Sequence, residues 1–75
     1  MAVPESNHDI PNFRRVLKGY NVKDVDRFLR DVSTRRQSGV TVPSSELLEA
    51  KFHISFVGYD VGEVDSYIAD LAKGR

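Results

Sequence analysis

The chain of 75 residues carries 11 basic and 11 acidic side chains, no cysteine, no tryptophan and 40% hydrophobic residues. A chain this short buries only about 60% of the surface of its unfolded form, so it holds one small domain at most. The absence of cysteine excludes a disulfide framework, a thiolate zinc site and a cysteine nucleophile. No apolar run approaches the ~20 residues that span a bilayer, and residues 1–11 lack the pattern of a secretory signal. We therefore expect a soluble, intracellular chain, or a fragment of one.

The charge is divided unevenly along the chain. Residues 1–38 hold eight basic and five acidic side chains, a net charge of +3, whereas residues 39–75 hold three and six, a net charge of −3. Opposite net charges favour contact between the halves. A contact within one chain and a contact between two chains both satisfy this pattern.

The first expected elements lie before Gly19. Val3-Pro4-x-Ser6 matches the start of a short helix, and residues 13–17 fit either one helical turn or an extended segment. Gly19 permits a positive φ or a close backbone approach where the chain turns into the next element.

A longer helix is expected directly after this turn. Asn21 is an N-cap residue, and Asp24 follows three positions later, as in a capping box. The helical spacing of apolar residues then predicts an amphipathic helix over residues 22–35. Two i,i+4 ion pairs are expected on its exposed side: Asp26 with Arg30, and Arg27 with Asp31.

The second half repeats this order of elements. A short helix is expected from Ser44 or Ser45 through Glu49, after Pro43. The alternation of apolar and polar residues over 52–56 predicts an extended segment. A second Gly-Tyr turn and a second amphipathic helix, over residues 61–73, follow.

An offset of 39 residues superimposes the two halves without a gap, so that Phe13 falls on Phe52. The shared structural motif comprises Phe13, Gly19, Tyr20, Asn21, Val25, Asp26 and their equivalents Phe52, Gly58, Tyr59, Asp60, Val64, Asp65. The sequence therefore predicts two tandem repeats, residues 1–38 and 39–75, in one compact unit. We expect a mainly α fold in which each repeat has a short helix or extended segment, a Gly-Tyr turn and an amphipathic helix. The repeats are expected to pack as a pseudo-dimer, with pairing between chains as the rival arrangement.

The motif Phe-x3-Phe-x-Gly-Tyr-Asp-x2-Glu-Val-Asp-x-Tyr-Ile, from Phe52 to Ile68, resembles the N-terminal domain of the DivIVA family of bacterial cell-division and polar-growth scaffolds. Phe13 to Leu29 is a second match, with Leu17 in place of the second aromatic residue. Together the matches cover residues 3–36 and 42–73. The resemblance implies a non-enzymatic, cytoplasmic module at the inner face of the membrane, which binds a protein partner or itself and contacts anionic lipid.

In that family an aromatic-basic pair before Gly-Tyr forms a loop tip that inserts at the lipid surface. By resemblance, the tips fall on Leu17-Lys18 and Phe56-Val57. The first tip has an aliphatic residue in place of the aromatic one, and the second has no basic residue. The resemblance implies no cofactor, no metal and no small-molecule substrate.

Basic residues of the first half form a second candidate surface, Arg14, Arg15, Lys18, Lys23, Arg27 and Arg30. They are expected to contact lipid headgroups or a protein partner, or to remain solvated and balance the acidic second half. The alternative is that the chain is a small helical domain that binds nucleic acid. Its pI of 6.7 is, however, well below that of a strongly basic DNA-binding protein.

Nothing in the sequence builds an enzyme site, so we expect no catalytic residues. Ser6, His8 and Asp9 are residue types of a catalytic triad, but adjacency along the chain is not the spatial arrangement that catalysis needs. His53 has no neighbours at metal-ligand spacing. The two Gly-Tyr tyrosines are expected to pack beneath their turns with their hydroxyls on backbone partners, and Asp26 and Asp65 to make helix-start or loop hydrogen bonds.

Overall fold

The computed structural model describes residues 11–74. Its elements in chain order are β1 (Arg15–Tyr20), α1 (Val22–Gln37), α2 (Ser44–Leu48), β2 (Ile54–Tyr59) and α3 (Val61–Ala72). The short helix expected near Pro4 and the Ser6, His8 and Asp9 side chains lie outside the described residues.

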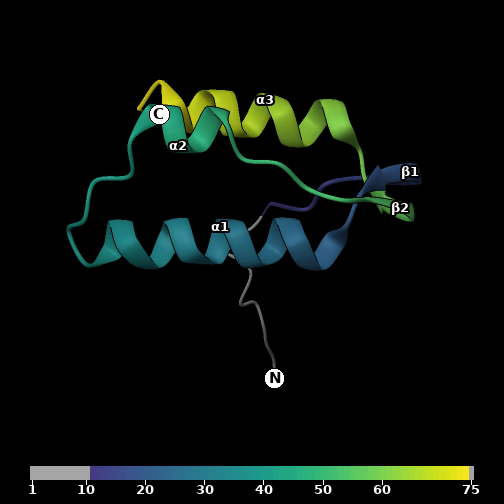
Figure 1. The fold of residues 1–75 in the computed structure, drawn as a ribbon, viewed down its shortest axis with the longest axis horizontal. Coiled ribbons are helices and arrows are strands. Elements are labelled where there is room, and N and C mark those ends of the chain that lie inside the picture. Colours follow the sequence, from purple (N-terminus) through teal and green to yellow (C-terminus); the bar gives the residue numbers. More distant parts are fainter. Residues whose placement is uncertain (1–10, 75) are drawn as a thin grey trace.

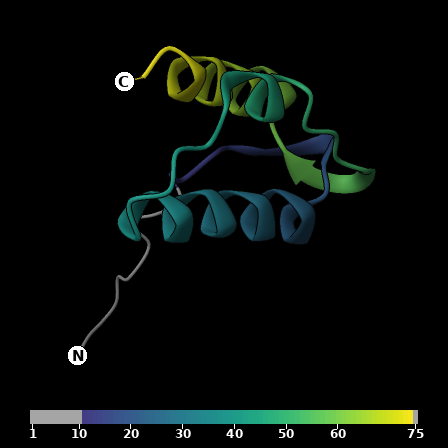
Figure 2. The same cartoon turned by 60° about the vertical axis from the view of Figure 1, so that its left-hand side comes forward.

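The two long helices, α1 and α3, lie side by side and run in the same direction (Figure 1). Their first turns stand next to the strands, because each strand leads into its helix through a single residue. The short helix α2 packs on α3, as the turned view in Figure 2 also shows. The Arg35 guanidinium ties α1 to α2 through an ion pair with Glu46.

Helices make up about half of the described residues, and the two strands form one antiparallel sheet, so the fold is mixed α/β. The prediction of a mainly α fold is right about the long helices and understates the extended part. Residues 13–17 had two interpretations, and Arg15–Leu17 are in a strand. They are extended because β2 supplies partners for their backbone groups, which a local pattern does not reveal.

Both long helices begin where the sequence predicts. The Asn21 carboxamide oxygen accepts the Asp24 amide at 3.0 Å, and the Asp60 carboxylate accepts the Glu63 amide at 3.1 Å. The capping-box interpretation is half right, because Asp24 and Glu63 do not bond back to the cap. Their carboxylates accept backbone N–H groups of the opposite half, from His53 and Arg14.

The core lies between the two long helices and the strands. Val25, Leu29 and Val32 of α1 face Val64 and Ile68 of α3, and all five are buried. The remaining buried apolar residues of the described chain are Phe13, Leu47 and Tyr59. The apolar stripes read from the sequence are therefore the faces by which the helices pack, as expected for amphipathic helices.

Candidate functional site

The strands β1 and β2 form the end of the molecule at which the predicted tips lie. Arg15 lies opposite Tyr59 and Tyr20 opposite Ile54, so the numbering rises along one strand as it falls along the other. Tyr20 also lies opposite Tyr59, where both strands run on into their helices. This last pair is parallel, whereas the others are antiparallel.

This register requires each strand to bend at its centre. A straight strand of six residues separates its ends by about 16 Å, yet Tyr59 lies opposite both Arg15 and Tyr20, each within about 5.5 Å. Tyr20 likewise lies opposite both ends of β2, Ile54 and Tyr59. Lys18, at the bend of β1, has a left-handed φ of 59°. The bends fall at Leu17-Lys18 and Phe56-Val57.

Glycine is required where the two bent strands cross. A Cβ atom on Gly19 would lie 2.6 Å from the Gly58 carbonyl carbon, and one on Gly58 would lie 2.7 Å from the Gly19 carbonyl carbon. Neither glycine has a positive φ. Of the two roles expected for Gly19, the close backbone approach is therefore the one it has.

The two halves hold each other by contacts that recur with an offset of 39 residues. The Asn21 amide donates to the His53 carbonyl at 2.7 Å, and the equivalent Asp60 amide donates to the Arg14 carbonyl at 2.7 Å. The rings of Phe13 and Tyr59 lie 5.2 Å apart, and their equivalents, Phe52 and Tyr20, lie 5.1 Å apart. Each contact joins the first half to the second.

The two motif tyrosines reach across in the same way. The Tyr20 hydroxyl donates to Asp65 at 3.0 Å, and the Tyr59 hydroxyl donates to Asp26 at 2.7 Å. The expectation of backbone partners is wrong, since both acceptors are carboxylates on the helix of the other half. Partial burial, followed by the bond to the carboxylate, raises the pKa of each tyrosine above its ordinary value of 10.0.

The bends carry large apolar side chains that face water. Leu17 is 67% exposed, Phe56 78% and Val57 50%, and Leu17 lies opposite Val57. Ile54 is also exposed, which the sequence analysis missed. The alternation over residues 52–56 predicted an extended segment correctly for Ile54 to Phe56, but the strand omits residues 52 and 53 and continues to Tyr59. The alternation gave no sign that Ile54 and Phe56 face solvent while Phe52 packs against the core.

The predicted basic residues surround these bends and continue along α1. Arg14, Arg15 and Lys18 are exposed on or beside β1, and Lys23, Arg27 and Arg30 are exposed on α1. The Arg14 guanidinium pairs with Asp60 at 3.1 Å, and that of Arg15 lies 5.1 Å from the centre of the Tyr59 ring.

Two acidic groups near the strands each bind a partner of the opposite half, Asp24 to His53 and Asp60 to Arg14. Hydrogen bonds from the amide and then from the imidazole of His53 lower the pKa of Asp24. The Glu63 amide and then the Arg14 guanidinium lower the pKa of Asp60. Both carboxylates therefore remain ionised near neutral pH and neutralise part of the basic charge close to the bends.

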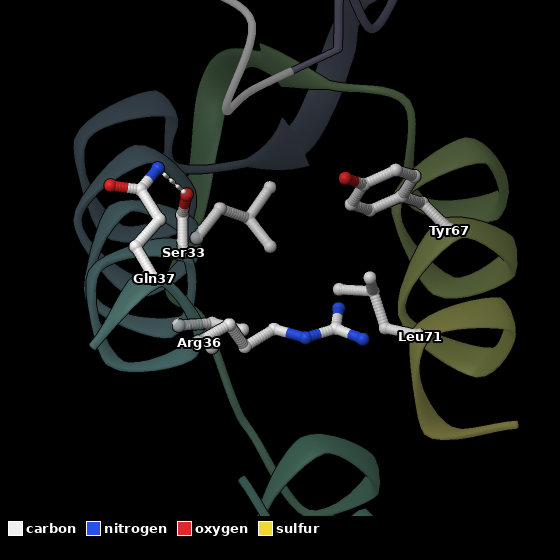
Figure 3. A pocket seen from close by; sticks show the side chains of 7 residues that line it. Ser33, Arg36, Gln37, Tyr67 and Leu71 are labelled. Atoms are coloured by element: carbon white, nitrogen blue, oxygen red, sulfur yellow. Dashed lines mark hydrogen bonds between the residues drawn. The ribbon is translucent and has the colours of Figure 1, made fainter. Parts of the chain in front are cut away.

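A groove of about 280 Å³ separates α1 from α3 (Figure 3). Leu29, Val32, Tyr67 and Leu71 contribute apolar surface, and the Arg36 side chain extends across the groove towards Leu71. The only side-chain hydrogen bond drawn there runs from Gln37 to Ser33 at 3.3 Å. The groove offers Ser33 no base that would activate its hydroxyl.

Within residues 11–74 no group of three or more histidine, aspartate or glutamate side chains is arranged to hold a metal ion. None of the helices described here is both long and apolar enough to cross a bilayer. No protein-family model, curated protein or solved structure matches this chain.

Proposed function

We propose that this chain is a non-enzymatic scaffold or interaction module of bacterial cell division or polar growth, similar to the DivIVA N-terminal domain. It contacts the inner face of the cytoplasmic membrane through the strand bends. The observation that carries the proposal is the adjacent exposure of Leu17, Phe56 and Val57 next to the cationic side chain of Lys18. Apolar side chains ringed by cations suit a surface of anionic headgroups over hydrocarbon.

The tandem pseudo-dimer is part of the same proposal. Two copies of one motif within the chain supply each other with the partners that a single copy lacks, and the reciprocal contacts offset by 39 residues support this arrangement. On this basis the isolated chain stays monomeric across a concentration series in sedimentation or light scattering. Concentration-dependent assembly would favour pairing between chains instead.

The contact is expected to be weak and reversible. A large apolar side chain contributes about 1.5–3 kcal/mol when fully buried, and a basic residue near an anionic surface about 1 kcal/mol. Three half-inserted side chains offset little more than the cost of association. Stable placement of a scaffold then needs several modules in one assembly, since linked binding events reinforce each other.

Co-sedimentation with vesicles of phosphatidylglycerol and phosphatidylcholine tests the proposal. Phe56→Asp and Leu17→Asp are expected to reduce binding at least tenfold, because they place a charge where the apolar side chain inserts. Leu48→Asp is the matched control, because Leu48 is 62% exposed on α2, away from the strands. This variant adds the same negative charge, and its affinity for the vesicles should stay within about twofold of that of the unmodified chain. Equal loss in all three variants, or no binding by the unmodified chain, rejects membrane contact through the bends.

Nucleic-acid binding is the second candidate, favoured by the exposed cations along α1. A DNA-binding titration at several salt concentrations distinguishes it, since phosphate contacts give a steep loss of affinity as salt rises. Negligible binding at low salt removes this candidate.

A further inference from the structure

Three exposed cations of α1 lie on the side of the helix that faces away from the core. Lys23, Arg27 and Arg30, here called the basic stripe, follow a spacing of four and then three residues. The buried residues Val25 and Leu29 follow Lys23 and Arg27 by two positions, which is about 200° of helical rotation. The stripe therefore points almost directly away from α3.

The acidic residues of α1 are engaged by other groups, whereas the stripe is not. Asp24 binds His53, Asp26 accepts the hydroxyl of Tyr59, and Asp31 pairs with Arg35 at 2.9 Å. The expected pairs of Asp26 with Arg30 and of Arg27 with Asp31 do not form. No ion pair joins a stripe cation to any residue between 11 and 74. The positive charge of the stripe thus remains available to a ligand.

The second half has no such surface. At the equivalent positions of α3 the stripe is replaced by Gly62, Ser66 and Ala69. The same holds at the strands, where the equivalents of Arg15 and Lys18 are Ile54 and Val57. Each of these five cations therefore has a small or apolar counterpart in the second half.

From this asymmetry we infer that the basic stripe is a second lipid-contact surface, which binds anionic headgroups while the bends insert. This inference rests on the proposed function and adds an orientation to it. The stripe begins in the first turn of α1, beside the strands, and Arg30 lies about 10 Å further along the axis, close to one Debye length at physiological salt. The module lies with α1 towards the bilayer and α3 away from it.

Two triple variants of equal net charge test the stripe. The stripe variant replaces Lys23, Arg27 and Arg30 with glutamine. The control replaces Arg36, Lys51 and Lys73 with glutamine, three exposed cations outside the stripe, of which Lys51 lines a groove together with Arg27. On vesicles of phosphatidylglycerol and phosphatidylcholine at low salt, we expect the stripe variant to bind about tenfold to a hundredfold more weakly than the unmodified chain, and to bind more weakly than the control. Its affinity should also fall less steeply as salt rises.

A position-sensitive measurement tests the orientation. The chain has no cysteine, so Thr34→Cys on the outer side of α1 and Ser66→Cys on the outer side of α3 each give one labelling site. A fluorescent label at position 34 is expected to be quenched by vesicles with quenchers in their headgroups, and a label at position 66 to be quenched much less.

Several results would overturn the inference. Equal weakening in the two triple variants would mean that net charge alone acts, and equal quenching at the two labels would exclude the orientation. If Phe56→Asp removes binding while the stripe variant binds normally, the bends contact lipid and the stripe does not. If the unmodified chain binds no vesicles, the proposed function itself fails. If the stripe variant loses affinity for duplex DNA and keeps it for vesicles, the stripe is a nucleic-acid surface.

Discussion

The two halves of this chain share their internal contacts and differ in their surfaces. In each, a bent strand crosses its counterpart at a glycine, a tyrosine reaches a carboxylate of the other half, and a capped helix follows. Outside these contacts the first half carries five exposed cations on β1 and α1 at positions where the second half has apolar or small residues. The residue type at a contact between the halves must fit the partners in both halves. The residue type at the surface must fit only what it meets outside the molecule.

The largest effect should come from the crossing glycines. Gly19→Ala and Gly58→Ala are each expected to destabilise the fold by about 3 kcal/mol or more, because the added Cβ meets backbone atoms of the other strand that cannot move aside. Chemical denaturation measures this. Gly62→Ala is the control: its Cβ would meet only the Asp60 carboxylate, at 3.3 Å, and its effect should stay within about 1 kcal/mol. A fold that tolerates one crossing alanine and not the other would contradict the equivalence of the halves.

The tyrosine hydroxyls should reveal a difference between the halves. Tyr59→Phe is expected to cost about 1.5–3 kcal/mol, since it removes a hydrogen bond to a partly buried carboxylate. Tyr20→Phe should cost less, because its bond to Asp65 lies exposed to water. Denaturation of both variants measures the two losses, and Asp26→Asn, alone and combined with Tyr59→Phe, completes the cycle that measures the coupling of Tyr59 with Asp26. Equal losses for the two tyrosines would mean that the exposure of the bond does not matter.

The smallest expected effect is the loss of folding stability at acidic pH. The folded-state pKa values of Asp24 and Asp60 lie below the ordinary value of 3.8, so their contribution to stability is present above that value and is lost as the pH falls through the lowered values. The free energy of unfolding should therefore decline below about pH 4. Asp60→Asn keeps an N-cap and should flatten this decline, as should Asp24→Asn. An unchanged pH profile in both variants would show that neither carboxylate accounts for the decline.

Much of the fold can be read from the sequence because its signals are local. The N-caps Asn21 and Asp60 and the apolar stripes involve residues at most a few positions apart, and they place the helix starts correctly. The resemblance to the DivIVA N-terminal domain implied tips at Leu17-Lys18 and Phe56-Val57, and these residues lie at the strand bends. The exposure of Ile54 could not be predicted in this way, since an alternating pattern does not tell which face will be covered.

The sequence by itself determined the motif, the helices with their caps and the uneven distribution of charge, since each depends on residue types at short spacing. Only the tertiary structure decided that the strands bend and cross, that the long helices run in the same direction, and where Asp24, Asp26 and their equivalents find partners. Those contacts join residues 29 to 49 positions apart, so their geometry exists only after both halves have come together. The availability of the basic stripe is likewise decided by the tertiary structure. In the folded chain the acidic residues of α1 bind other groups, and the cations of the stripe are left to meet a ligand.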